Sequence, residues 1–201
     1  ERLLDVIPTD CVVTLITNAS VNLDNNKIFT KLSQRSRVGW SLSFDNIGQR
    51  FEYVRSGSDW DQLLQNLDLI QNLMKNNGHW GGIHAVYNIY NASRLVELTE
   101  FARERGLTIH WQSLYQPECL DPQRLGPEIS ELAKVEIKNL LEQDLCLESE
   151  RNFFDNVVAN SNQIDDLREK LRTHTLHLET KYHPEHQGWF QRLWPEIENL
   201  C

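Results

Sequence analysis

Four short apolar runs, each rich in β-branched or aromatic residues, most constrain how this chain folds. Each run has about the length of a buried strand. A segment with the apolar spacing of a helix follows every run, and strands that alternate with helices predict a parallel sheet with helices packed against it. The predicted strands are Cys11–Thr17, Val38–Ser43, Ile83–Asn88 and Leu107–Leu114.

The helical segments carry start and stop signals of their own. In Asp59–Lys75, the longest, apolar residues recur three and four positions apart and so form one face of a helix. We expect Ser58 to cap its N-terminus and Gly78 to lie just past its end. The other predicted helices are Lys27–Arg35, Ser93–Arg105 (capped by Asn91 or Ser93 and ended by Gly106), Pro127–Glu142, Arg151–Val158, Gln163–Leu178 and Gln187–Asn199.

The alternation of strands and helices stops before Glu148, and the rest of the chain is helical in pattern. We therefore divide the chain into an α/β part, residues 1–147, and a helical C-terminal extension, residues 148–201. With 201 residues, 40% of them hydrophobic, the chain is long enough for a real core.

Charge and cysteine content exclude several classes of function. The net charge is −9 and no basic cluster is present, which argues against binding to nucleic acid. No apolar run approaches the ~18 residues of a membrane span. The cysteines are far apart, with no C-x-x-C pair for zinc or a cluster, so we expect reduced thiols and a cytoplasmic location. They are Cys11, Cys119, Cys146 and Cys201.

Polar residues follow the predicted strands at their carboxyl ends, where parallel β/α folds place their chemistry. Together they fit a ligand rich in hydroxyl groups that also carries a carboxylate. These residues are Thr17 and Asn18 after the first strand, Ser43 and Asp45 after the second, Asn88 and Asn91 after the third, and Gln112, Ser113 and Gln116 after the fourth.

Arg55 lies in the segment after the second strand, and its planar guanidinium suits a carboxylate. The alternative is a surface ion pair with Glu52 or Asp59. Histidines form two pairs three residues apart near the C-terminus, His174 with His177 and His183 with His186. Such pairs could chelate a metal, but no third ligand has a fixed position, so a solvated helix is the favoured interpretation.

Segments of this chain, taken in order, resemble the radical S-adenosylmethionine (radical SAM) family, in the branch with SPASM or twitch C-terminal extensions. The resemblance covers most of the chain. Ile16–Ala19 resembles the Thr-Asn-Gly that ends the family's third strand, with Ala19 in place of Gly, and Trp40–Asn46 resembles the Ser-Leu-Asp-Gly of the fourth. The other matching segments are Phe51–Trp60 with Leu64–Leu67, Val86–Asn91, Gln116–Asp121 and Trp194–Glu196.

The resemblance implies a partial parallel β/α barrel, of which this chain would hold strands three to six of six. It implies that Ser43 and Arg55 contact the carboxylate or ribose of S-adenosylmethionine (SAM) and that Asn88 hydrogen-bonds it. By the same resemblance Thr17, Asn18 and Asp45 would line the mouth of the site, and Leu114 would lie near the adenine.

The implied cofactors are SAM and a [4Fe–4S] cluster, and the implied activity is reductive cleavage of SAM to start hydrogen abstraction. The implied partners are a peptide or small-molecule substrate and a reductant such as flavodoxin or ferredoxin. The C-x-x-x-C-x-x-C loop that holds the cluster precedes the family's third strand, so we expect it upstream of Glu1. The alternatives are a catalytically inactive half-barrel binding module and, less favoured, an unrelated β/α-barrel hydrolase or aldolase.

Overall fold

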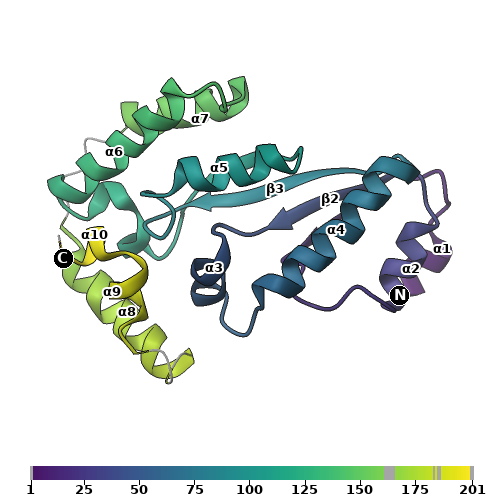
Figure 1. The fold of residues 1–201 in the computed structure, drawn as a ribbon, viewed down its shortest axis with the longest axis horizontal. Helices are drawn as coiled ribbons and strands as arrows, with labels where there is room; N and C mark the ends of the chain where they lie inside the picture. The colour runs from purple at the N-terminus through teal and green to yellow at the C-terminus, as the bar shows by residue number, and fades with distance from the viewer. Residues whose placement is uncertain (1, 161–165, 183, 185–186, 200–201) are drawn as a thin grey trace.

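The computed structural model describes residues 2–160, 166–182, 184 and 187–199 (Figure 1). Its sheet has four parallel strands in sequence order, with β1 and β4 at the edges. This confirms the α/β class, whereas membership of a barrel stays a prediction. The strands are β1 (Val13–Thr17), β2 (Val38–Ser43), β3 (Trp80–Tyr87) and β4 (Thr108–Ser113).

The bounds of β2 agree with the prediction, but β3 begins three residues before the predicted Ile83. The sequence did not indicate this start because Gly81 and Gly82 occupy it, and glycine weakens a strand pattern. Both are needed for close approach of the backbones. A Cβ on Gly81 would lie 2.5 Å from the carbonyl oxygen of Trp40, and one on Gly82 would lie 2.7 Å from that of Thr108.

Helices cover one face of the sheet and follow one another across it (Figure 1). They bury an apolar stripe against strand residues such as Trp40, Ala85 and Trp111. The helices α4 and α5 are joined by the rings of Trp60 and Phe101, 5.4 Å apart. The helices of this layer are α2 (Lys27–Ser33), α4 (Trp60–Asn77), α5 (Leu95–Glu104), α6 (Pro127–Glu142) and α7 (Glu148–Ala159).

The helix caps differ in part from the prediction. Asp59, rather than Ser58, caps α4, because its carboxylate accepts a hydrogen bond from the amide of Gln62 at 2.7 Å. Gly78 ends α4 with a φ of +70°, as predicted. The prediction that Asn91 or Ser93 caps α5 is wrong: Glu136 of α6 accepts the amide of Val96.

Several short elements lack strong sequence signals. The helix α3 (Gly48–Val54) follows β2, and its N-cap, Ile47, makes no side-chain capping bond. The others are α1 (Arg2–Val6) and the 3₁₀ turns η1 (Glu118–Leu120) and η2 (Pro122–Arg124).

The C-terminal helices lie beyond the carboxyl ends of the strands (Figure 1). They are α8 (Arg168–Tyr182), α9 (Trp189–Leu193) and α10 (Pro195–Glu198). The single helix predicted over Gln187–Asn199 is two helices, because Pro195 cannot donate the backbone bond that would continue α9. These three helices form the tail of the chain. They bury Trp194 and Phe190 against Tyr53 and Tyr90, in a second apolar core.

The predicted division at residue 147/148 remains a prediction. The first helix after it, α7, packs on β4, and its Phe154 belongs to the core of the sheet. The second apolar core is formed mainly by the turns after β3 and β4 together with α8, α9 and α10. The packing of the extension is therefore shared between the two cores.

Candidate functional site

The sheet has one face that the helices cover and one that they leave open. Alternate residues of a strand point to opposite faces. Apart from Gly39, those that point away from the helices are half-buried or exposed, for example Ile16 at 72% and Trp80 at 46% exposure, whereas Trp40 and Ile83 on the covered face are at most 2% exposed. The open face is therefore the part of the sheet that can receive a ligand.

Arg55 brings together the polar residues at the carboxyl end of β2. It is the C-cap of α3, so the end of this helix aims its side chain back at the strand. Its Nη2 donates to Ser43 Oγ at 3.3 Å and lies 3.2 Å from Asp45 Oδ2. Arg55 Nε is buried and has no hydrogen-bond partner among the described residues. The guanidinium therefore keeps hydrogen-bonding capacity beyond these two contacts.

The ion pair that forms is not one of the two expected for a surface arginine. Glu52 accepts the amide of Trp60 at 2.9 Å, and Asp59 caps α4. Asp45 is the partner of Arg55, and its side chain is only 8% exposed. Burial raises the pKa of the Asp45 carboxyl, and its bonds from the Val86 amide and the Arg55 guanidinium offset part of that rise.

Asn88 lies next to this group, but its amide is engaged within the turn. Its Nδ2 donates to the carbonyl oxygen of Val86 at 2.8 Å, and its Oδ1 accepts the amide of Tyr90 at 2.9 Å. Asn91 Nδ2 donates to the carbonyl oxygens of Val86 and Asp45. The two asparagines thus hold the end of β3 against the end of β2.

The remaining predicted residues lie at other places along the strand ends. Thr17 pairs in register with Leu42, directly before Ser43, and its Oγ1 accepts the amide of Ala19. Asn18 is exposed and accepts from Ser20. Leu114 is partly buried against the second apolar core. The structure therefore brings together Ser43, Asp45 and Arg55, with Asn88 beside them; it leaves Thr17 and Asn18 at the edge strand.

Two histidines that the sequence analysis did not single out lie on the open face. His84 on β3 pairs in register with His110 on β4, and their rings stack with centroids 5.4 Å apart and planes at 15°. Ser43 on β2 pairs with His84. The alternation of strand residues was the signal that could have identified both histidines, once the covered face was known.

The histidine pairs of the tail are placed differently. His174 is half-buried and His177 is exposed on α8, and burial lowers the pKa of His174. His183 and His186 lie outside the described residues. Over the described ranges, no group of three or more His, Cys, Asp or Glu side chains is placed to hold a metal ion.

The described cysteines are free thiols. Cys11 is exposed, whereas Cys119 and Cys146 are at least partly buried, and burial raises the pKa of both of these thiols. Cys201 lies outside the part of the chain that the structure describes.

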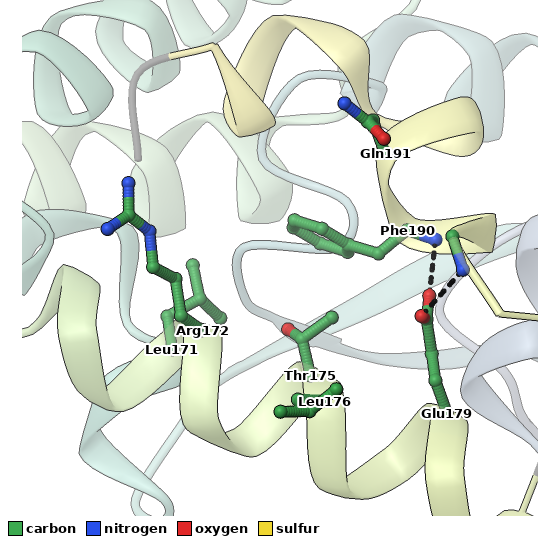
Figure 2. A pocket seen from close by; sticks show the side chains of 8 residues that line it. Leu171, Arg172, Thr175, Leu176, Glu179, Phe190 and Gln191 are labelled. Atoms are coloured by element: carbon green, nitrogen blue, oxygen red, sulfur yellow. Dashed lines mark hydrogen bonds between the residues drawn. The ribbon is translucent and has the colours of Figure 1, made fainter.

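A hollow of about 270 Å³ lies between α8 and α9, where Phe190 faces Thr175 (Figure 2). The Glu179 carboxylate at one end of it accepts the amides of Gly188 and Phe190, both at 2.8 Å (Figure 2). None of the strand-end residues lines this hollow. The main polar contact of this hollow, made by Glu179, joins α8 to the start of α9. We therefore assign the candidate site to the open face of the sheet.

Comparison with known proteins yields no relative. No protein-family model matches the chain, and no match was found among curated proteins or among solved structures. Among the described helices, none is both long and apolar enough to cross a membrane.

Proposed function

We propose that this chain is the SAM-binding, C-terminal part of a radical SAM enzyme, and that Ser43 and Arg55 hold the amino-acid end of SAM. The observation that carries the proposal is the convergence of Ser43, Asp45 and Arg55 at the carboxyl end of β2. A parallel sheet with helices on one face supports it, because such sheets bind ligands at the carboxyl ends of their strands.

The geometry of Arg55 suits a carboxylate. Its two contacts come from Nη2 and its Nε is buried, so Nη1 is left for a ligand, and a charge-assisted hydrogen bond from a guanidinium to a carboxylate is a strong one. Asp45 fixes the guanidinium, and the amide of Val86 in turn fixes Asp45 at 2.7 Å. The arginine is thus held in position before a ligand arrives, which lowers the entropic cost of binding.

The described residues do not fit a [4Fe–4S] cluster. Such a cluster needs several cysteine thiolates close together, and the described cysteines are not so placed. The proposal assigns the cluster ligands to a part of the protein outside these residues. A cluster held there would supply the electron for cleavage of SAM, whereas the role of Ser43 and Arg55 would be to hold the amino-acid end of SAM.

Binding of SAM to this chain tests the proposal. We would measure the dissociation constants of SAM and of 5′-methylthioadenosine, which lacks the amino-acid end, by isothermal titration calorimetry. Arg55→Ala should weaken binding of SAM by about tenfold or more, which is ~1.4 kcal/mol, and should leave 5′-methylthioadenosine unchanged.

Arg105→Ala is the matched control. Arg105 has a side chain 25% exposed, against 27% for Arg55, and it also pairs with one carboxylate, that of Asp68. Arg105 is the C-cap of α5 and lies away from the carboxyl ends of the strands. Failure of SAM to bind, or equal losses in the two variants, would refute the proposal.

A further inference from the structure

The described strands carry no acidic side chain on either face, although the chain as a whole is acidic. Asp and Glu account for 29 of 201 residues and the net charge is −9. Within the described strands, however, no position that points to the open face is an Asp or a Glu. The residues that point there are Thr14, Ile16, Gly39, Ser41, Ser43, Trp80, Gly82, His84, Val86, Thr108, His110 and Gln112.

Hydrogen-bond donors form a row across this face. His110, His84 and Ser43 occupy directly paired positions on β4, β3 and β2, and Arg55 donates to Ser43 at the end of the row. Neighbouring strands lie ~4.8 Å apart, so one small ligand can reach two members of the row. The carboxylate at the end of the row, Asp45, is already engaged by Arg55 and the amide of Val86.

A hollow of about 340 Å³ adjoins the row and is bordered by His110. Its floor contains Gly39 and Gly82, and the exposed indole of Trp80 lies against Gly39, where a Cβ would be 3.0 Å from the indole nitrogen. The indole ring of Trp80, which covers Gly39, and the neighbouring Gly82 give a flat surface that is largely apolar. This surface fits an aromatic ring or a short apolar chain.

We propose that the open face binds a carboxylic acid with a flat or short apolar body. The carboxylate lies on the imidazoles of His84 and His110, and the body lies in the hollow against Trp80 and Gly82. The binding itself does not require SAM. The assignment of such acids as the substrate class of the enzyme rests on the proposed function.

Benzoate is the probe that tests this inference, with benzamide as the uncharged molecule of the same shape. At about pH 6 we would follow the imidazole Cε1–H signals of the 201-residue chain by NMR during a titration. Benzoate should shift the signals of His84 and His110 and bind at least about tenfold more tightly than benzamide.

Three variants identify the residues responsible. His84→Gln and His110→Gln should each weaken benzoate binding by about threefold to tenfold and keep the melting temperature, because neither side chain belongs to the buried core. His174→Gln on α8 is the control and should bind benzoate as the wild type does. Equal affinity for benzoate and benzamide, no binding of either, or indifference to both open-face variants would overturn the inference.

The same samples separate this inference from the proposed function. If both hold, His84→Gln weakens the binding of benzoate and leaves that of SAM unchanged, and Arg55→Ala weakens the binding of SAM. Binding of benzoate without binding of SAM would remove the proposed function and leave the acid site. Binding of SAM without binding of benzoate would remove the acid site and leave the proposed function.

Discussion

The Glu150 carboxylate on α7 accepts the backbone amide of Ile109 on β4, at 3.0 Å, and also pairs with the guanidinium of Arg103 on α5. It accepts the amide of Leu147 as well, at 2.9 Å, which caps its own helix. Glu150 is 2% exposed, so this single buried carboxylate joins an edge strand to two helices. It explains why α7 packs on the sheet rather than with the helices of the tail.

Glu150→Gln should destabilise the protein by about 3 kcal/mol. The amide has one acceptor oxygen instead of two and leaves Arg103 without its charged partner, and breaking a buried pair is costly. Urea unfolding followed by circular dichroism measures the difference. Glu148→Gln, two residues away and exposed, is the control, and a loss equal in the two variants would show that the buried contacts contribute little.

Glycine substitutions on the two faces of the sheet should have different costs. Gly81→Ala places a Cβ 2.5 Å from the carbonyl oxygen of Trp40, which is backbone and cannot move aside, so we expect a loss of about 1–3 kcal/mol. In Gly39→Ala the nearest atom belongs to the exposed indole of Trp80, which can swing into solvent, so the loss should be smaller. The urea midpoints of the two variants measure these losses. A larger loss for Gly39→Ala would contradict the placement of Trp80.

The strands could largely be predicted from the sequence. The bounds of β2 and the start of β3 show what made a prediction succeed or fail. The bounds of β2 could be predicted because Val38, Trp40 and Leu42 recur at every second position, which is the period of a strand with one buried face. The start of β3 was missed because Gly81 and Gly82 have no strand preference of their own. What keeps them in the strand is the close approach of the neighbouring backbones, a tertiary contact that no local pattern encodes.

The candidate site could be predicted only in part for the same reason. The carboxyl ends of the strands gave Ser43, Asp45 and Arg55, but the partner of Arg55 was sought among its sequence neighbours Glu52 and Asp59. The partner found is Asp45, ten residues earlier, because α3 folds the chain back onto the end of β2. The pairing of His84 with His110 depends on the register of β3 and β4, which no local sequence pattern encodes.

Glu179 should hold the start of α9 against α8. Its two oxygens accept the amides of Gly188 and Phe190, so Glu179→Gln leaves one of these two amides with a weaker partner or none, at about 1–2 kcal/mol. Hydrogen exchange of the Phe190 amide should accelerate about tenfold, which corresponds to ~1.4 kcal/mol. Glu169→Gln, on the same helix with a side chain 83% exposed, is the control and should leave that exchange rate unchanged.

Asp45 should make stability depend on pH in a defined direction. Burial raises the pKa of its carboxyl in the folded protein above the ordinary value of 3.8, so the folded state binds this proton more tightly than the unfolded state does. The corresponding stability is fully present below about pH 3.8 and is lost as the pH rises through the folded-state pKa. Asp45→Asn does not titrate.

The free energy of unfolding of the wild type should therefore fall relative to that of Asp45→Asn as the pH rises from about 4 to about 7. Urea midpoints at several pH values give this difference directly. Asp24→Asn removes an exposed carboxylate and corrects for the change in net charge alone. A difference with the opposite slope would mean that Arg55 and the Val86 amide outweigh burial, so that Asp45 is held as a carboxylate by its partners at every pH at which the protein folds.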